Sequence, residues 1–417
     1  MKQIREINLS SVLVNLHQNG PLSRAQLAAI TDLNKSTISS LVEDLIDRDL
    51  VVEYGIDASG IGRPATLLNL NPRAGSIIGV EIGVDFISVI LTSLTGQILW
   101  QHCDDFDSKY RQVETISRVF QIIDEACEVA QERGERLLGM GLALPGMVNV
   151  EEGILAFSPN LQWSDVTLGE IFTKYTGLPV FIDNDANAAA MGEHLFGVAR
   201  QAKHFLFIID GVGVGGGLFL NGDLYRGANG LAGEIGHTSM YVEQASPCRC
   251  GNNGCWENLA NQSSLYERIR RRLEVGRTSS IRGILANRNS PLTLSIITQA
   301  AKAGDYEALE ALRETGSALG MGVANLINIF NPEMVVIGGS MSAASEFIIP
   351  SVQMIVEKRS LANIRKHTQI FGSAFGTDAS VVGAAALVVQ AIYLNPYSVN
   401  PVHEFLPISN GGGNGVR

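Results

Sequence analysis

The chain has 417 residues, of which 46% are hydrophobic and 18% are charged, and its net charge is −11. This composition is that of a globular protein with two or three domains, and it excludes a disordered chain. The acidic balance argues against a protein that coats nucleic acid over its whole surface, although a small DNA-binding module at one end is compatible with it. Because we find neither a signal peptide nor a run long enough to cross a membrane, we expect a cytoplasmic protein without a membrane partner.

Residues 1–71 are predicted to form a winged helix-turn-helix domain. Ser23 and Gln26 have the spacing of a capping box at the start of a helix over 24–30, and a second helix starts at Lys35 after a short turn. Apolar residues recur along this second helix at the spacing of one buried face, namely Ile38, Leu41, Val42, Leu45 and Ile46. Two strand-like runs, 50–54 and 66–70, then flank a turn-rich segment that resembles a wing.

Polar and basic side chains lie where such a domain contacts DNA. The expected DNA-binding residues are Arg24, Lys35, Ser36, Thr37, Ser39 and Arg63. Arg63 is placed at the wing tip, where it would reach a narrow, A·T-rich minor groove. Residues 1–75 hold seven basic and eight acidic residues, for a net charge of −1, but residues 1–40 hold four basic and only two acidic ones. A three-helix module that binds protein instead of DNA is the alternative.

After residue 71 the pattern becomes that of an α/β protein with an internal repeat. A strand, a glycine turn and a second strand occupy 77–91, and the same layout recurs at 205–220. Helices are expected over 112–133 and 164–175, and a strand over 179–183. We therefore expect two lobes, 72–200 and 201–394, that close on a cleft, with the last helix packing back on the first lobe. The glycine-rich tail from Asn395 to 417 is expected to be disordered.

Three of the five cysteines lie within eight residues, and a histidine stands eleven positions upstream. These residues are His237, Cys248, Cys250 and Cys255. Three thiolates and one imidazole complete a closed tetrahedral shell, which is typical of structural zinc. The alternatives are buried free thiols or a disulfide, although Cys-x-Cys spacing is too tight for easy pairing. A zinc ion there would also fix Glu234 and Glu257, which flank the ligands.

From about residue 77 to 390 the chain resembles the ROK family of repressors, open reading frames and sugar kinases. The resemblance rests on Gly233-Glu-Ile-Gly-His237, the cysteine cluster, Asp183-Asn-Asp-Ala-Asn-Ala-Ala189 and Val336-Ile-Gly-Gly339. It implies an α/β fold of two actin/hexokinase-like (ribonuclease-H-like) lobes with a zinc knuckle. The winged helix in front is similar to that of the transcriptional-regulator branch of the family, which includes xylose-type and glucose- or N-acetylglucosamine-type sugar repressors.

The resemblance also implies a set of sugar-binding residues. They are Asn160, Asn184, Asp185, Glu234, His237 and Glu257. Carboxylates and carboxamides suit a monosaccharide, because each hydroxyl both donates and accepts hydrogen bonds. His237 would place one ring nitrogen on zinc and the other on a sugar hydroxyl. The structural alternative for Asn160 is that it is only a turn residue. Asn187 is expected to cap the helix that follows it.

The nucleotide side of the resemblance departs from the kinases. In the family's kinases the aspartate at the position of Asp185 is the general base. The first phosphate loop, normally Asp-x-Gly-Gly-Thr, is Glu81-Ile-Gly-Val-Asp85 here, and the second, Gly211–Gly217, also lacks its hydroxyl. Lost donors and an added carboxylate both oppose ATP. Asp185 would then be a vestigial base.

We therefore expect a sugar-responsive transcriptional repressor and not an enzyme. Its partners would be a monosaccharide effector and operator DNA, the latter an inverted repeat read by a homodimer or tetramer. The alternative function is an ATP-dependent sugar kinase with an accessory DNA-binding domain. A sensor controlled mainly by a protein partner is a third possibility.

Overall fold

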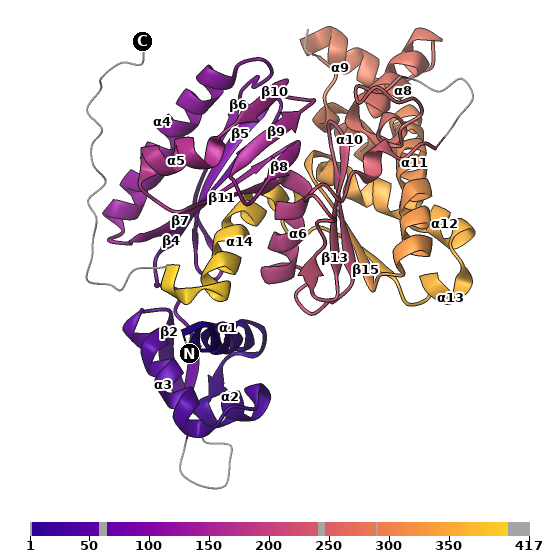
Figure 1. Ribbon diagram of the computed structural model, residues 1–417. Helices are drawn as coiled ribbons and strands as arrows, with labels where there is room; N and C mark the ends of the chain where they lie inside the picture. The colour runs from indigo at the N-terminus through magenta and orange to yellow at the C-terminus, as the bar shows by residue number, and fades with distance from the viewer. Residues whose placement is uncertain (1, 58–64, 241–246, 289–290, 399–417) are drawn as a thin grey trace.

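A winged-helix unit stands beneath two α/β lobes in the computed structural model (Figure 1), which describes residues 2–57, 65–240, 247–288 and 291–398. Each lobe is built on a five-stranded sheet. We call the lobe that contains β4 the first lobe and the lobe that contains β12 the second lobe.

The winged-helix unit has the predicted elements, preceded by a long helix. Its elements are α1 (Lys2–Asn19), β1 (Leu22–Ser23), α2 (Arg24–Thr31), α3 (Lys35–Asp47), β2 (Val51–Asp57) and β3 (Ala65–Leu70). The capping box is confirmed, since Ser23 and Gln26 each bond the backbone N–H of the other. Asn34 caps α3 by accepting from the Thr37 N–H. Ile38, Leu41, Val42 and Leu45 are buried, so the predicted inner face of α3 is confirmed.

The first lobe has the sheet order β11-β7-β4-β5-β6. Its strands are β4 (Ser76–Ile82), β5 (Phe86–Ser93), β6 (Ile98–Asp105), β7 (Leu137–Leu144) and β11 (Val180–Asn184). β4 and β5 form the predicted antiparallel hairpin, while β7 and β11 extend the sheet in parallel. Helices α4 (Gln112–Glu132) and α5 (Leu168–Thr176) share one apolar core with a face of this sheet.

The prediction of a single helix over 164–175 was wrong at its start. A small sheet of β8 (Met147–Asn149), β9 (Ile154–Ser158) and β10 (Trp163–Val166) precedes α5. Ser164 pairs with Phe157 of β9, and the helix begins only at Leu168. Trp163 and Val166 are both buried in the first-lobe core. Asp165 between them has a left-handed φ of 54°, which interrupts the alternation that would otherwise turn the two side chains to opposite faces.

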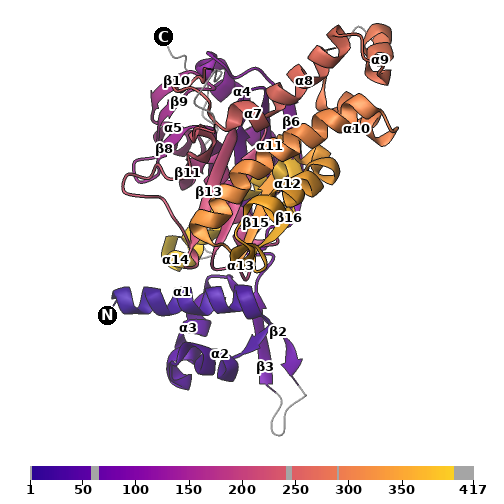
Figure 2. The same cartoon turned by 90° about the vertical axis from the view of Figure 1, so that its right-hand side faces the viewer.

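The second lobe has the sheet order β14-β13-β12-β15-β16. Its strands are β12 (Phe205–Asp210), β13 (Val214–Leu220), β14 (Asp223–Leu224), β15 (Met334–Gly338) and β16 (Gln369–Gly372). β12 and β13 repeat the antiparallel hairpin of the first lobe, as predicted. Helices α11 (Tyr306–Phe330) and α12 (Ser345–Arg359) cover the outer face of this sheet (Figure 2). The lobe also contains α8 (Gln262–Glu274), α9 (Ser280–Arg288), α10 (Leu294–Lys302) and α13 (Ala362–Arg365), of which α9 and α10 project beyond the end of the sheet.

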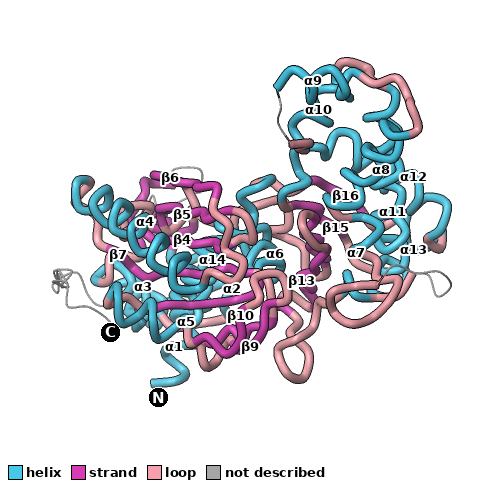
Figure 3. The backbone as a smooth tube through the Cα atoms, turned by 90° about the horizontal axis from the view of Figure 1, so that it is seen from above, coloured by secondary structure: helices cyan, strands magenta, loops and turns pink. Residues whose placement is uncertain are grey.

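Two helices, α6 (Asp185–Leu195) and α14 (Ala379–Leu394), lie between the sheets of the two lobes (Figure 3). Small residues let them approach each other closely. A Cβ on Gly383 of α14 would lie 2.1 Å from the carbonyl oxygen of Ala188 in α6. α14 is equally close to the first-lobe sheet, since a Cβ on Gly141 would lie 1.8 Å from Ala384 O. The two helices therefore pack backbone to backbone, with little room to slide.

Residues 376–394 have the length and apolar composition of a membrane span, unlike the expectation from the sequence, but 72% of the stretch is buried inside the protein. Beyond it, the short helix η4 (Pro396–Ser398) is ordered, and the Tyr397 hydroxyl donates a hydrogen bond to Asp44. The expected start of the tail at Asn395 is thus too early, because Tyr397 has partners in the winged helix. Residues 399–417 lie outside the described chain.

Candidate functional site

Four metal-binding side chains meet at one point of the second lobe. The ligand atoms of His237, Cys248, Cys250 and Cys255 all lie within 4.8 Å of one another. His237 ends the short helix η1 (Ile235–His237), and the cysteines belong to the loop before helix α7 (Glu257–Ala260). The fold therefore brings the predicted ligand set together, and this set can hold a metal ion.

Two distances within the cluster match the edges of a tetrahedral site. The Sγ atoms of Cys250 and Cys255 are 3.7 Å apart, and Cys248 Sγ lies 3.7 Å from His237 Nδ1. Sulfur ligands about 2.3 Å from zinc, at the corners of a tetrahedron, are about 3.8 Å from each other. A disulfide requires about 2.05 Å, so the Cys250–Cys255 distance does not fit the disulfide alternative.

Two glycines and a tryptophan shape the cysteine loop. Gly251 and Gly254 have φ angles of 91° and 72°, which favour glycine and turn the chain as the sequence predicts. Trp256 is buried against Gly322 of α11, and its indole N–H donates to the carbonyl of Ala318 at 2.9 Å. The metal-binding loop is thus anchored to the longest helix of the second lobe that the structure describes.

Carboxylates surround His237 on both sides of its ring. Glu257 Oε1 lies 3.5 Å from His237 Nδ1, the nitrogen that also faces Cys248, whereas Glu234 Oε2 lies 3.7 Å from Nε2. The ring can therefore serve the metal with Nδ1 while Nε2 faces the other way.

Burial raises the pKa of two acids in this region. Burial raises the pKa of Asp185 to about 6, and the charge of Glu234 adds to the shift. Burial also raises the pKa of Glu234, where the charge of Glu257 adds and that of His237 opposes. The three acids thus lie within electrostatic range of one another. Carboxylates crowded in this way gain most from a ligand that donates hydrogen bonds to them, as a sugar hydroxyl does.

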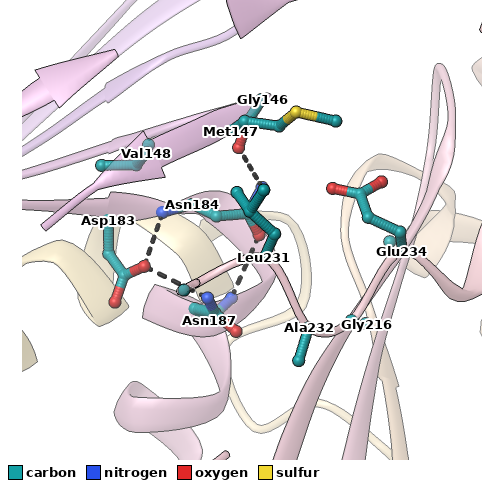
Figure 4. Close-up of a pocket in the computed structure, with 13 residues that line it drawn as sticks. Gly146, Met147, Val148, Asp183, Asn184, Asn187, Gly216, Leu231, Ala232 and Glu234 are labelled. Carbon is teal, nitrogen blue, oxygen red and sulfur yellow. Dashed lines mark hydrogen bonds between the residues drawn. The ribbon is translucent and has the colours of Figure 1, made fainter. Parts of the chain in front are cut away.

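A small pocket opens beside these acids (Figure 4). It encloses about 40 Å³ and is lined by the turn after β7, the start of α6, glycines of β13 and the loop 230–234. Asn184 and Glu234, two of the expected sugar ligands, line it directly. This volume suffices for only a few water molecules. A monosaccharide therefore requires the pocket walls to move apart.

The cap of α6 differs from the one expected from the sequence. Asn184, and not Asn187, is the cap of α6: its Oδ1 accepts from the N–H groups of Ala186 and Asn187, and its Nδ2 donates to Gly146 O at 3.1 Å. The cap must precede the first helical residue, which is Asp185, so Asn187 lies too far along the helix. Asn187 lines the pocket instead and donates to Asp183 Oδ1 at 3.2 Å.

The remaining expected ligands lie on the metal side of the same region. A Cβ on Gly213 would lie 3.0 Å from Glu257 Oε2 and 3.8 Å from Asn160 Nδ2, so all three meet at the tip of the β12–β13 turn. Arg249 of the cysteine loop donates to Asn160 Oδ1 at 3.4 Å, across the two lobes. The six expected residues therefore gather around one cleft, although only two line the pocket itself.

Two residues near the pocket were missed by sequence reasoning. Arg226, in the loop after β14, donates to Asp183 Oδ2 at 2.6 Å. Neither residue belongs to the expected ligand set, and they are 43 positions apart. Asp183 is the first residue of the Asp183-Asn-Asp185 motif, at the end of an apolar strand. A buried acid at that position needs a cationic partner, and this was the available signal in the sequence.

Buried acids lie in or next to the two segments that the resemblance relates to phosphate binding. Glu81 is 6% exposed, and burial raises its pKa well above the ordinary value, with the charges of Asp185 and Asp378 adding. Just before the second segment, the side chain of Asp210 is fully buried and has no hydrogen-bond partner among the described residues. The carbonyl of Gly211 accepts from the Gln262 N–H.

Four of the expected DNA-binding residues lie in the first turns of α3, and Arg24 begins α2. Lys35 and Ser36 are exposed at the start of α3, and Thr37 and Ser39 are half-buried beside them. Ser36 and Ser39 donate locally, to Asn34 Oδ1 and Lys35 O. Arg24 lies 3.4 Å from Glu53 of β2 in an exposed ion pair. Arg63 lies outside the described residues.

A comparison with known protein families identifies the chain. The model of the ROK family matches residues 77–391, which include both lobes and the metal-binding cluster. The chain belongs to the ROK family. In addition, the model of the MarR family matches residues 10–56 of the winged-helix unit.

Individual ROK proteins resemble the chain over different lengths. The putative xylose repressor of Caldicellulosiruptor sp. (strain Rt8B.4) is 34% identical over 395 residues, which is 94% of this chain and 98% of the relative. A solved ROK family transcriptional regulator, a homologue of the E. coli MLC protein, has a TM-score of 0.80 at 30% identity and covers 94% of this chain and 97% of its own. A ROK family glucokinase from Streptomyces griseus, solved with glucose and AMPPNP, has a TM-score of 0.67 at 30% identity but covers only 75% of this chain and 99% of its own. The kinase thus covers a smaller share of this chain than the transcriptional regulator does.

Proposed function

We propose that this ROK protein is a sugar-responsive transcriptional repressor, in which residues 1–71 bind operator DNA and the lobes 72–200 and 201–394 bind a free monosaccharide. The observation that carries the proposal is the combination of an exposed helix start at Lys35 and Ser36 with a cleft lined by carboxylates. The similarity to a putative xylose repressor over 94% of the chain supports it. A cytoplasmic location follows from operator binding.

The sugar-binding set in this proposal is Asn160, Asn184, Asp185, Glu234, His237 and Glu257. Their mutual distances support one shared ligand, and the raised pKa values of Asp185 and Glu234 support a ligand rich in hydrogen-bond donors. We start the search for this ligand with xylose, because the relative named above is a putative xylose repressor. Glucose and N-acetylglucosamine follow.

In the same proposal the ion held by His237 and the three cysteines is structural zinc. The set of one nitrogen and three sulfur ligands supports a structural role, because it would fill all four coordination positions of the zinc and leave none open for catalysis. The zinc would hold His237 and, through the anchored loop, Glu257 in place for the sugar.

The proposed protein does not transfer phosphate. Asp85, which replaces the hydroxyl residue of the first loop, would oppose the triphosphate, and the second loop also has no hydroxyl to offer it. Asp185 favours the second candidate, an ATP-dependent sugar kinase, because its raised pKa of about 6 suits a general base. A coupled assay of ATP consumption decides between the two. A turnover number above about 1 s⁻¹ with any common hexose or pentose contradicts the repressor.

Operator binding is proposed to involve two or more copies of the chain on an inverted repeat, because one winged helix offers too few contacts for tight specific binding. The test uses DNA selected from a pool of random duplexes by the full-length protein. Lys35→Glu is expected to abolish binding to the selected DNA while leaving sugar binding unchanged. If Lys35→Glu binds as well as the unaltered protein, the assignment of α3 to the major groove is wrong.

A further inference from the structure

Helix α6 has the sugar-pocket residues at one end and the DNA-binding unit at the other. Asn184 and Asp185 stand at its N-terminus, and the carbonyl of Leu195 at its C-terminus lies 2.7 Å from His17 Nε2 of α1. Eleven helical residues extend about 16 Å. The helix is buried along most of its length, so it is a short rod between the two proposed binding sites.

His17 is bonded on both ring nitrogens and on its backbone. A carbonyl only accepts, so Nε2 carries the hydrogen toward Leu195, and Nδ1 accepts from the Tyr393 hydroxyl of α14 at 3.2 Å. Arg200 donates to the carbonyl of His17 at 3.0 Å. Burial, with the charge of Arg200 adding, lowers the pKa of His17 to about 4, so the ring is neutral at pH 7, as this pattern requires.

The winged-helix unit has a second fixed point, on α3. Tyr397, just beyond α14, donates to Asp44 Oδ2 at 3.0 Å, and the Arg48 guanidinium lies 4.2 Å from the centre of the Tyr397 ring. Arg5 of α1 also lies 2.9 Å from Asp44. The C-terminal helix therefore contacts α1 through Tyr393 and α3 through Tyr397.

Close packing makes α6 move as a unit with its neighbours. Gly192 of α6 faces Gly383 of α14 so closely that a Cβ would lie 3.1 Å from the Gly383 backbone, and a Cβ on Gly217 of β13 would lie 2.5 Å from Ala186 O. One continuous apolar cluster also joins the winged-helix core to α6 and α14. A displacement at the pocket end of α6 cannot be absorbed locally, because the contacts have no free space.

We propose that His17 is the positioning residue through which α6 and α14 transmit sugar binding to the winged helix. This inference rests on the proposed function. When the pocket walls separate to admit a sugar, the Leu195 end of α6 moves, and the hydrogen bonds of His17 turn that movement into a new orientation of α1 and α3. Sugar binding and operator binding are thus coupled through one neutral imidazole. By linkage, the operator changes the affinity for the sugar by the same factor by which the sugar changes the affinity for the operator.

The test measures a coupling ratio, defined as the dissociation constant for selected operator DNA with a saturating sugar divided by the constant without it. D-xylose, D-glucose and N-acetyl-D-glucosamine are the probes, and the full-length protein is used throughout. We expect a ratio that differs from one by about 5- to 150-fold for the unaltered protein. His17→Phe keeps an aromatic ring beside Phe196 and Tyr393 but removes both hydrogen bonds, and the ratio is expected to fall to within about twofold of one.

Three further variants separate coupling from general damage. His17→Gln restores a donor and an acceptor and should recover most of the ratio. Tyr393→Phe removes only the hydroxyl and should lower the ratio partly, which keeps the test decisive if His17→Phe folds poorly. Gln18→Phe is the matched control, because Gln18 is the exposed neighbour of His17 on the same helix, and its ratio should be unchanged. Sugar affinity without DNA should stay within about twofold in all four.

Each outcome decides the inference. Reduced ratios in His17→Phe and Tyr393→Phe, with sugar affinity and sugar-free operator affinity retained, support it. If both variants keep the ratio of the unaltered protein, or weaken operator binding equally with and without sugar, His17 is a merely structural contact and the inference is overturned. If the unaltered protein itself shows a ratio of one with every sugar, the proposed function fails and the inference fails with it.

Discussion

Arg226 and Asp183 form an ion pair that joins the two lobes at the pocket, with 2.6 Å between Nη2 and Oδ2. Asp183 is only 2% exposed, and its other oxygen accepts from Asn187. Arg226 belongs to the second-lobe loop that continues into the pocket wall at 230–234, whereas Asp183 belongs to β11 of the first lobe. The wall of the pocket is therefore tied to the opposite lobe by a largely buried charge pair.

Removal of Arg226 is expected to destabilise the protein more than removal of both charges. Arg226→Ala leaves the buried Asp183 carboxylate unpaired and should lower the free energy of unfolding by about 3 kcal/mol. Adding Asp183→Asn to Arg226→Ala removes that charge and should recover more than half of the loss. Urea denaturation measures both variants. Equal stability of the single and double variants would show that an unpaired Asp183 carboxylate does not destabilise the fold.

The cysteine cluster is expected to hold one zinc ion per chain. Cys250→Ser should remove the metal, lower the melting temperature and weaken sugar binding together, because His237 and Glu257 lose their anchor. Cys103→Ser is the matched control, since Cys103 is an exposed thiol outside the cluster, and it should keep full metal content. Elemental analysis of the purified proteins gives the metal content. An unaltered protein that contains no zinc contradicts the assignment.

Asp185→Asn is expected to stabilise the protein while it weakens sugar binding. The pKa of the Asp185 carboxyl is raised to about 6 in the folded chain, above its unfolded value, so its ionised form is unfavourable in the fold. This cost is absent below the unfolded pKa and is complete above pH 6, where it amounts to about 3 kcal/mol. Asparagine removes the charge, so the free energy of unfolding at pH 7 should rise by a similar amount. A less stable variant at pH 7 would mean that Asp185 has a stabilising partner instead.

Acid is expected to destabilise the protein through His17. The folded pKa of about 4 lies below the ordinary value of 6.5, so the unfolded chain binds the proton more tightly. The contribution of the neutral His17 ring to the free energy of unfolding is therefore complete above pH 6.5 and is lost as the pH falls toward 4. Between pH 7 and pH 5 the loss is about 2 kcal/mol. The ring is faced by Tyr393, Arg200 and His194, of which the last also has a lowered pKa.

The measurement compares unfolding free energies of the unaltered protein and His17→Gln at pH 7 and pH 5. Because carboxylates titrate in both proteins, their contribution cancels in the comparison. His17→Gln should lose about 2 kcal/mol less than the unaltered protein over this interval. Parallel pH profiles of the two proteins would indicate that His17 is not held neutral by the fold.

Local patterns predicted much of this structure. The capping box of Ser23 and Gln26, the buried face of α3 and the clustering of His237 with the cysteines all depend on spacing within short segments, where backbone geometry leaves few alternatives. The segment 164–175 was harder, because burial of Trp163 in the first-lobe core decides its strand, and that core is assembled from distant residues.

Long-range polar contacts could not be predicted from spacing. Arg226 pairs with Asp183 across 43 positions, His17 meets Leu195 across 178, and Tyr397 meets Asp44 across 353. Each depends on how two complete units dock, and a single arginine, histidine or tyrosine in the sequence does not indicate its partner. The residues that connect the pocket to the winged helix are all of this kind.

The most direct test of the account is the effect of a sugar on operator binding by the full-length protein. Operator DNA is selected from random duplexes, and its dissociation constant is measured with and without xylose, glucose, N-acetylglucosamine and other monosaccharides, in the presence and absence of ATP. The account predicts that at least one sugar changes the constant by about 5- to 150-fold, and that ATP has no effect. A constant that no sugar changes, together with ATP consumption above about 1 s⁻¹ on one of them, would contradict it.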